Sequence, residues 1–289
     1  MILITGAAGK TGQAIIRALR KRGEALRAVA RRPEQADALK ALGVEEVIVG
    51  DLLDGPEMKR AVQGARAVYH IAPNVNPHEV AIGRNVIAAA KSAQVERFVF
   101  HSVLHPQVEA MPHHWQKMRV EELLFESGLP FTILQPTAYM QNILAYWQSI
   151  REQGVYAVPY PPQTRLSLVD LEDVAEAAAL VLTEGGWLGA TLELVGTAPL
   201  SQTDLAEILS RRLNRPVRAA AVPLETWEQN ARSSGMGEYQ ITALMQMFRY
   251  YARHGLIGSP SVLKCLLRRP PASFEDFIER TIWEQNHAY

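Results

Sequence analysis

Short apolar segments alternate with amphipathic segments of helical length along the first half of the chain, and this alternation predicts an α/β fold with a doubly wound parallel sheet. Two further observations favour the same fold class. Most apolar segments are hydrophobic on both faces, as strands are in a sheet covered by helices. Several amphipathic segments end at a glycine directly before the next apolar segment, where a left-handed residue closes a helix.

The predicted elements follow one another in a regular order. Strands are expected at residues 2–5, 25–30, 46–50, 67–71, 97–103 and 131–135. Helices are expected between them at residues 11–22, 33–42, 56–63, 78–93 and 114–127. The glycines that end four of these helices are Gly23, Gly43, Gly64 and Gly128.

The regular alternation weakens after about residue 150. Residues 158–162 are rich in proline and predict a loop, whereas 166–169, 170–183 and 191–195 still predict strand, helix and strand. Residues after Pro199 are mostly helical and carry bulky side chains that form either core or the wall of a ligand site. These side chains are Trp227, Tyr239, Met245, Met247, Phe248, Tyr250 and Tyr251. We therefore expect a cofactor-binding domain at 1–153 and a smaller, mainly helical C-terminal substrate lobe at 154–289, with elements near 165–197 returning to the first domain.

The composition is that of a folded globular protein and excludes several classes. The 289 residues include 30 Lys and Arg and 30 Asp and Glu, so the zero net charge argues against nucleic-acid binding and against an anionic membrane surface. The one cysteine, Cys265, excludes an intrachain disulfide framework and indicates a reducing compartment. Because no apolar segment is long enough to span a membrane and the N-terminus lacks the features of a signal peptide, a cytoplasmic protein is expected.

The segment Thr5-Gly6-Ala7-Ala8-Gly9-Lys10-Thr11-Gly12 lies between the first predicted strand and the first predicted helix. Its glycines allow a tight turn, close approach of a phosphate and close helix–strand contact, and the helix amides then face a pyrophosphate. Ala8 stands where the common fingerprint has its second glycine. The context predicts a dinucleotide site in a Rossmann-type domain, with a purely structural turn as the alternative. ATP hydrolysis is not expected, because Ile4 replaces the first glycine of an ATPase loop.

The residues after the second and third predicted strands bear on the choice of cofactor. Arg31 and Arg32 stand where an NAD site usually has a carboxylate, and a guanidinium there suits the 2′-phosphate of NADP. The alternative is a solvated pair that opens a helix. Asp51 is placed to accept from the adenine amino group, or else it only caps the turn before the next helix.

Taken together, these motifs make the chain resemble the NmrA-like family, an atypical branch of the extended short-chain dehydrogenase/reductase superfamily. The resemblance covers most of the chain through residues 5–12, 50–52, 70–73, 98–102, 117–124, 134–136, 168–175 and 200–213. It implies adenine-side cofactor contacts near Asp51 and Leu52, contacts of Ala72 and Pro73 with ribose and phosphates, and nicotinamide-side positions for Ser102 and Pro136.

One departure from the superfamily concerns catalysis. Typical members carry a Tyr-x-x-x-Lys pair, in which the tyrosine is the general acid and the lysine holds the nicotinamide ribose. Lys117 matches the lysine, with a solvated surface lysine as the alternative, but His113 replaces the tyrosine. The two residues share a helical face if this turn is helical, so His113 is a candidate proton donor. Loss of the tyrosine argues against reduction of carbonyls but is compatible with hydride transfer to an electron-poor quinone.

Further candidates flank these residues. His101, His105, His113 and His114 match no common metal-ligand spacing, so we expect solvent-facing loop histidines and no metal site. The segment around Ser102 lacks the glycines of a hydrolase nucleophile elbow. Tyr139 and Asn142 follow the sixth predicted strand and are expected to line the substrate end of the nicotinamide, or to pack at a lobe junction.

Two functions stay open on this basis. The first is an NADPH-dependent reductase of a quinone-like or other small electron-poor acceptor. The alternative is a non-catalytic NADP(H) redox sensor that acts through a protein partner. A DNA-associated regulator is the least favoured interpretation, because the chain has no net positive charge.

Overall fold

The fold is described from a computed structural model, which places the backbone of residues 1–287 and the side chains of residues 1–282. The chain divides into two compact units. The first consists of Met1–Glu109, His113–Pro136 and Val174–Leu192, and the second contains 110–112, Thr137–Asp173 and the residues from Glu193 onward.

The first unit is built on a seven-stranded sheet with the order β11-β6-β5-β4-β1-β2-β3. Its strands are β1 (Ile2–Ile4), β2 (Leu26–Ala30), β3 (Glu46–Val49), β4 (Ala67–His70), β5 (Arg97–His101), β6 (Phe131–Pro136) and β11 (Thr191–Leu194). Ile2 of the central strand pairs in parallel with Leu26 on one side and with Ala67 on the other. The strand order thus reverses at β1, which confirms the predicted doubly wound parallel sheet and places a topological switch point between β1 and β4.

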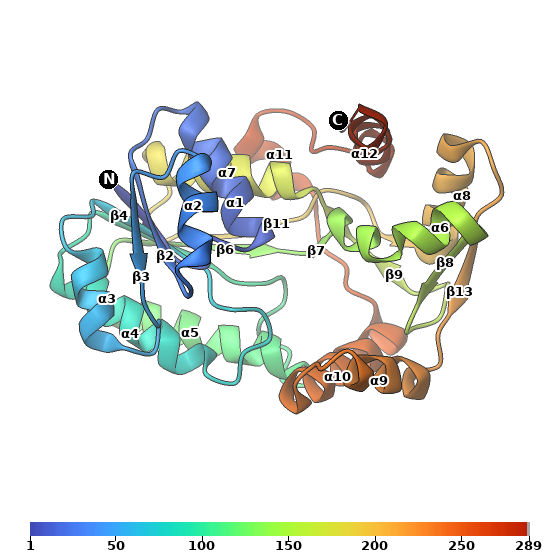
Figure 1. The fold of residues 1–289 in the computed structure, drawn as a ribbon, viewed down its shortest axis with the longest axis horizontal. Coiled ribbons are helices and arrows are strands. Elements are labelled where there is room, and N and C mark those ends of the chain that lie inside the picture. The colour runs from blue at the N-terminus through green and yellow to red at the C-terminus, as the bar shows by residue number, and fades with distance from the viewer. Residues whose placement is uncertain (288–289) are drawn as a thin grey trace. The chain divides into compact units, whose positions relative to one another are not determined.

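Helices cover both faces of this sheet. Figure 1 shows α3 (Gly55–Val62), α4 (Glu79–Ser92) and α5 (Pro112–Ser127) on one face. It shows α1 (Lys10–Lys21), α2 (Glu34–Ala41) and α7 (Leu171–Thr183) on the other. The core under α3, α4 and α5 contains Met58, Val86 and Val120 packed with Phe98 and Ile133. The four predicted helix-ending glycines all have positive φ angles, as that prediction requires.

The second unit is mainly helical, as predicted for residues after Pro199. Its helices are the 3-10 helix η1 (Met140–Tyr146), α6 (Trp147–Gln153), α8 (Gln202–Leu213), α9 (Leu224–Ser233), α10 (Glu238–His254), α11 (Ser261–Leu267) and α12 (Phe274–His287). Three short strand pairs complete it: β7 (Ala138–Tyr139) with β10 (Leu168–Val169), β8 (Val155–Val158) with β13 (Arg218–Ala221), and β9 (Arg165–Leu166) with β12 (Leu200–Ser201).

The single strand predicted at 166–169 is wrong, because the structure divides it into β9 and β10. Ser167 lies between them and donates its backbone amide to the carbonyl oxygen of Leu256 at 2.8 Å. Its own carbonyl oxygen accepts from Thr137 Oγ1 at 2.9 Å. These contacts turn β9 toward β12 and leave β10 to pair with β7.

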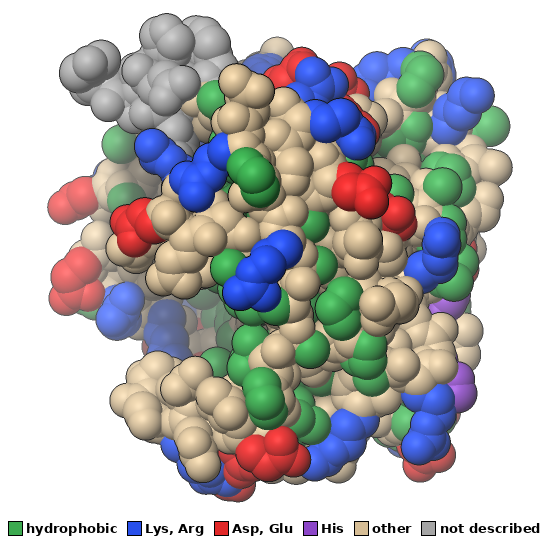
Figure 2. Space-filling model, turned by 90° about the vertical axis from the view of Figure 1, so that its right-hand side faces the viewer, with side chains coloured by type: hydrophobic (Ala, Val, Ile, Leu, Met, Phe, Trp, Pro, Cys, Tyr) green, Lys and Arg blue, Asp and Glu red, His purple; other side chains and the backbone are tan. Residues whose placement is uncertain are grey.

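On the face drawn in Figure 2, Lys and Arg side chains are scattered among Asp and Glu, and neither sign gathers into one continuous patch. Within the described part of the chain, every helix falls short of the length and apolar character needed to cross a membrane.

Candidate functional site

The turn between β1 and α1 contains three glycines with different surroundings. Gly6 has a φ of 62°, and a Cβ atom there would lie 2.8 Å from the carbonyl oxygen of Ile71. A Cβ atom on Gly12 would lie 2.5 Å from the carbonyl oxygen of Gly6. On exposed Gly9, among the described residues, a Cβ atom would meet only that same oxygen, at an acceptable 3.4 Å. The fold therefore requires glycine at 6 and 12, whereas at position 9 the missing side chain leaves open surface.

This open surface borders the amino end of α1. Gly9 is the N-cap, and no side chain in the described structure caps the helix there. The first turn has no acidic residue, and Lys10 is exposed beside half-buried Ala8 and Thr11. First-turn amides lack partners within a helix and lie at the positive end of its dipole. A pyrophosphate fits this position, because it accepts hydrogen bonds and its negative charge is stabilised there.

Arg31 and Arg32 follow β2 at the same edge of the sheet, and both are exposed. Gln35 Oε1 accepts from their backbone amides at 3.0 and 3.1 Å, which fixes the turn into α2. Neither guanidinium has an ion-pair partner among the residues that the structure describes. The two positive charges are therefore available to an anionic group.

Asp51 and Leu52 follow β3. Asp51 is exposed, and its Oδ1 accepts from the backbone amide of Leu53 at 2.9 Å, so the turn-capping role is present. Leu52 is buried. A contact between Asp51 and adenine stays a prediction.

Buried polar groups join the ends of β1 and β4. Thr5 is fully buried, and its Oγ1 forms a hydrogen bond with His70 Nδ1 at 2.8 Å. The same oxygen donates to the carbonyl of Ile71 and accepts from its amide, both at 3.0 Å. The hydroxyl of Thr5 thus ties the turn after β1 to the turn after β4. Beyond Ile71, Ala72 is buried and Pro73 is exposed.

Lys117 forms an ion pair with a buried carboxylate. Its Nζ donates to Glu79 Oε1 at 2.7 Å, and the side chains of Lys117 and Glu79 are 15% and 2% exposed. The ammonium also lies 5.7 Å from the centroid of the Phe100 ring. The interpretation of Lys117 as a solvated surface lysine is therefore wrong, because α4 places Glu79 opposite it.

His113 lies with Lys117 on α5, so the two share a helical face as the spacing predicts. Burial, together with the charge of Lys117, lowers the pKa of His113 to about 4. Its Nδ1 is buried and has no hydrogen-bond partner among the described groups. The imidazole is therefore neutral at pH 7, which weakens it as a proton donor.

Ser102 and Glu121 form a buried pair that the sequence reasoning missed. The hydroxyl of Ser102, just after β5, donates to Glu121 Oε1. Gln135 Nε2 donates to both carboxylate oxygens of Glu121, at 2.9 and 3.1 Å. Burial raises the pKa of Glu121, and the hydrogen bonds and Lys117 oppose this only in part. A usable signal was present, since Glu121 follows Lys117 by four residues and stands directly after the apolar Val120.

The expectation of solvent-facing loop histidines is wrong for three of the four, namely His113, described above, His101 and His114. His101 is the last residue of β5 and 5% exposed, and His114 is fully buried on α5. Burial lowers the pKa of each to about 3. His101 Nδ1 forms a hydrogen bond with the Tyr69 hydroxyl at 2.7 Å. In the described region, no three His, Cys, Asp or Glu side chains are grouped so as to hold a metal ion.

The remaining predicted residues lie around the end of β6 and in the second unit. Pro136 is buried, and its carbonyl oxygen accepts from the amide of Leu104 at 2.9 Å. Tyr139 is half-buried on β7, and Asn142 is exposed on η1. Their contact with a substrate stays a prediction.

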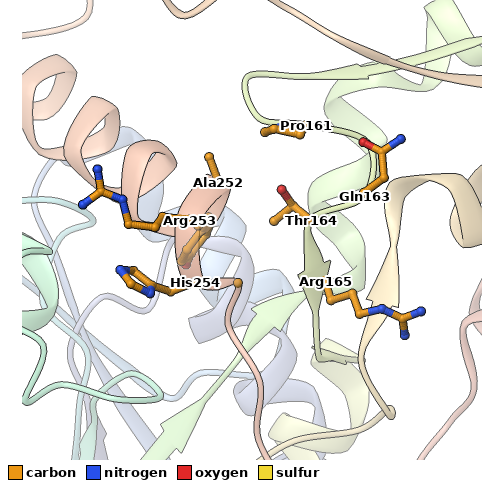
Figure 3. A pocket seen from close by; sticks show the side chains of 9 residues that line it. Pro161, Gln163, Thr164, Arg165, Ala252, Arg253 and His254 are labelled. Atoms are coloured by element: carbon orange, nitrogen blue, oxygen red, sulfur yellow. The ribbon is translucent and has the colours of Figure 1, made fainter.

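A separate pocket of about 260 Å³ lies in the second unit between residues 161–165 and the end of α10. Figure 3 shows Thr164 pointing into it, whereas Arg165 and Arg253 point away. The Thr164 hydroxyl is buried and has no hydrogen-bond partner among the described atoms. None of the predicted site residues lines this pocket.

Comparisons with known proteins show which family the chain resembles over its whole length. A model of the NmrA-like family matches residues 1–283. An NAD(P)H azoreductase from Xenophilus azovorans is 30% identical over 281 residues, which cover 96% of this chain and 97% of that protein. Quinone oxidoreductase 2 from Escherichia coli is 28% identical over 280 residues, which cover 96% of this chain and 97% of that protein.

Solved structures agree as well. An NADPH-dependent quinone oxidoreductase from Escherichia coli, complexed with NADPH, superposes with a TM-score of 0.86 at 27% identity, covering 98% of this chain and 100% of that one. NmrA, a negative transcriptional regulator, has a TM-score of 0.77 at 21% identity over 100% of this chain and 98% of its own. At that identity the likeness to the regulator concerns the fold alone.

Proposed function

The chain belongs to the NmrA-like family, and we propose on that basis that it is an NADPH-dependent reductase of a small electron-poor acceptor such as a quinone. The observation that carries the proposal is the turn at Gly9, where open surface meets the uncapped amino end of α1. The similar proteins described above that act on azo compounds and quinones support a reductase rather than a regulator.

The first unit supplies the groups that would hold NADPH. The first-turn amides of α1, those of Lys10, Thr11 and Gly12, bind the pyrophosphate, and the Lys10 side chain adds positive charge. Arg31 and Arg32 bind the 2′-phosphate with paired donors, which selects NADPH over NADH. The remaining contacts on the adenine and ribose side come from Asp51, Leu52, Ala72 and Pro73.

The nicotinamide end uses residues after β5 and β6 and on α5. When bound, NADPH supplies a hydride to the acceptor. Lys117, held by Glu79, orients the nicotinamide ribose, and Pro136 flanks the ring. Tyr139 and Asn142 bind the acceptor. The chain's task is to orient the two reactants and exclude water.

Reduction of a quinone also consumes one proton. We assign it to the Ser102 hydroxyl, with Glu121 behind it. Because burial raises the pKa of Glu121, its carboxyl group holds a proton to higher pH than a free glutamate does. In the structure the Ser102 hydroxyl donates to Glu121, so for this step it would turn toward the acceptor oxygen and pass its hydrogen there, while a protonated Glu121 carboxyl would donate to Ser102 Oγ. Solvent would then restore the proton on Glu121.

The test is NADPH oxidation, followed by the loss of nicotinamide absorbance, with a panel of quinones, aldehydes and ketones. Turnover is expected with quinones. Gly9→Val tests the cofactor site separately from the fold. The extended backbone at this position accepts valine, but the added side chain occupies the surface proposed for the pyrophosphate. This variant should fold and lose NADPH binding by calorimetry. Tight NADPH binding by the wild type without turnover of any acceptor would favour a sensor, and unchanged binding by Gly9→Val would refute the cofactor site.

A further inference from the structure

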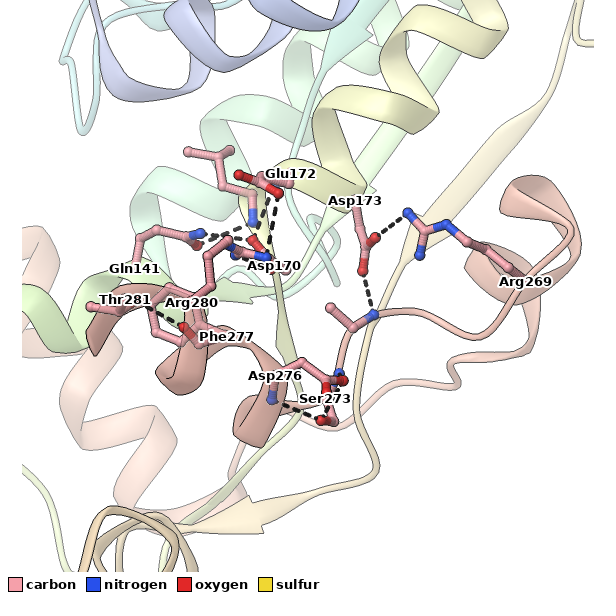
Figure 4. A network of polar contacts seen from close by, with 12 residues as sticks. Gln141, Asp170, Glu172, Asp173, Arg269, Ser273, Asp276, Phe277, Arg280 and Thr281 are labelled. Atoms are coloured by element: carbon pink, nitrogen blue, oxygen red, sulfur yellow. Dashed lines mark hydrogen bonds and ion pairs between the residues drawn. The ribbon is translucent and has the colours of Figure 1, made fainter. Parts of the chain in front are cut away.

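A network of buried ion pairs connects the C-terminal region to the segment that carries Tyr139 and Asn142. Figure 4 shows Asp170 between Gln141 and Arg280, with a second pair, Asp173 and Arg269, close by. Asp170 is fully buried and Asp173 is 2% exposed. The mechanism proposed above uses none of these five polar side chains, so their concentration here needs a separate explanation.

Gln141 joins the predicted acceptor segment to the start of α7. Its Nε2 donates to Asp170 Oδ1 at 2.8 Å, and its Oε1 accepts from the backbone amide of Leu171 at 3.1 Å. Next to this contact, β7 pairs in parallel with β10, and Tyr139 lies opposite Val169, the residue before Asp170. Both ends of the Gln141 amide are thus engaged, and the backbone between Tyr139 and Asn142 is held at this point.

Arg280 on α12 supplies the charge that Asp170 requires. Its Nη2 donates to Asp170 Oδ2 at 2.5 Å, and its Nη1 lies 3.3 Å from Glu172. Asp170 Oδ1 also accepts from the Glu172 amide at 3.0 Å. Without Arg280 the fully buried carboxylate would have no opposite charge in direct contact among the described residues. A carboxylate in that state must take up a proton or move toward water, and either change disturbs its bond to Gln141.

The neighbouring pair resembles the first one in chemistry but differs in what it touches. Arg269 Nη2 donates to Asp173 Oδ1 at 2.7 Å, and Asp173 Oδ2 accepts from the amide of Ala272 at 2.7 Å. This pair ties the chain before α12 to α7. No hydrogen bond within the described residues links Asp173 to Gln141.

We propose that Arg280 is a positioning residue for acceptor binding, which acts through Asp170 and Gln141 to fix the turn that carries Tyr139 and Asn142. The C-terminal helix thereby becomes part of the acceptor site without touching the acceptor. This inference rests on the proposed function for the assignment of Tyr139 and Asn142, whereas the positioning itself rests on the contacts above.

The experiment compares Arg280→Met with the matched control Arg269→Met, since each removes one arginine from one buried aspartate. Arg280→Met is expected to raise the KM for a quinone about tenfold, as small displacements of positioning groups do, with the Kd for NADPH unchanged. Arg269→Met should destabilise the protein but leave the quinone KM near the wild-type value. Arg280→Lys, which restores the charge without the second contact to Glu172, should recover part of the loss.

Hydrogen exchange gives a readout that does not depend on turnover. Amides of residues 139–146 should exchange faster in Arg280→Met than in Arg269→Met, measured on full-length protein under the same conditions. If Arg280→Met fails to fold, Gln141→Leu offers a second route, because Gln141 is only half-buried and its removal breaks the same link. It should produce the same change in KM and in exchange.

The outcomes separate this proposal from the proposed function. Equal exchange over 139–146 in the two arginine variants would overturn the positioning role, as would an equal rise in quinone KM. If the wild type fails to oxidise NADPH with every acceptor tested, the proposed function fails. The exchange comparison then still decides whether Arg280 fixes the turn.

Discussion

Acidification from about pH 7 to about pH 5 is expected to destabilise the first unit strongly, because it contains several buried neutral histidines. Burial, together with the positive charge of Lys117, lowers the pKa of His70, His101 and His114 to about 3 and that of His113 to about 4. In the unfolded chain these groups take up protons near pH 6.5. Above about pH 6.5 the unfolding free energy is therefore undiminished by these histidines. It falls as the pH drops from there toward their pKa values in the folded protein.

The size of the effect follows from these values. Each histidine that stays neutral in the fold lowers the free energy of unfolding by about 1.4 kcal/mol per pH unit below 6.5, or about 2 kcal/mol at pH 5. Four independent groups would reach about 8 kcal/mol, a large part of the total stability of a typical domain. Within the first unit Glu121 opposes this loss, because burial raises its pKa and protonation then favours the fold.

The assay is urea unfolding followed by tryptophan fluorescence, repeated between about pH 7 and pH 5, where the slope of the unfolding free energy against pH reports proton uptake. His70→Asn removes one buried titrating group and keeps a polar atom near the position of Nδ1, which contacts Thr5. Its stability at pH 7 will be lower, but the slope at low pH should flatten by about one proton. His78→Asn controls for the substitution itself, since His78 is exposed. A slope unchanged in His70→Asn, or a wild type equally stable at both pH values, would refute the reasoning.

Three further predictions concern the site. Arg31→Ala should weaken NADPH binding by about 1.5–3 kcal/mol, at least about tenfold, and leave NADH binding nearly unchanged by calorimetry; equal losses for both would contradict a 2′-phosphate contact. Lys117→Met should destabilise the protein by about 3 kcal/mol, because it leaves the buried carboxylate of Glu79 unpaired, and the double variant with Glu79→Gln should recover stability in urea unfolding but not turnover. Recovery of both stability and turnover in the double variant would show that Lys117 has only a structural role. His113→Ala should reduce quinone turnover only slightly, because the neutral imidazole is a weak proton donor and the proton is assigned to Ser102 and Glu121; a loss in steady-state rate as large as that of Ser102→Ala would contradict this assignment.

Local patterns were sufficient to predict the sheet of the first unit. The strand and helix alternation, the helix-ending glycines and the turn from Thr5 to Gly12 are properties of neighbouring residues, and the structure confirms the sheet that they imply. The predicted strand at 166–169 failed because Ser167 bonds to Leu256, far away in sequence. Local sequence contains no signal for such a contact.

The site residues show the same limit. The partner of Lys117 is Glu79, 38 residues earlier on another helix, so the sequence around Lys117 could not distinguish a surface lysine from a buried ion pair. His101 and His114 were expected in solvent-facing loops because their spacing matches no metal-ligand pattern, yet each occupies an inward position of a strand or helix. Spacing within α5 predicts which side chains share a face, but only tertiary packing decides which of those faces is buried.

The three glycines of the first turn place different demands on the chain, and the difference has a consequence for how this sequence can change. Substitutions at Gly6 or Gly12 collide with backbone and threaten the fold, whereas an alanine at Gly9 finds room. A copy of this protein released from selection for its cofactor can therefore replace Gly9 while retaining the other two glycines and an intact sheet. A substitution at position 9 would therefore indicate lost cofactor binding in a chain that still folds. A relative with alanine or a larger residue there is predicted to be a folded protein that no longer binds a dinucleotide.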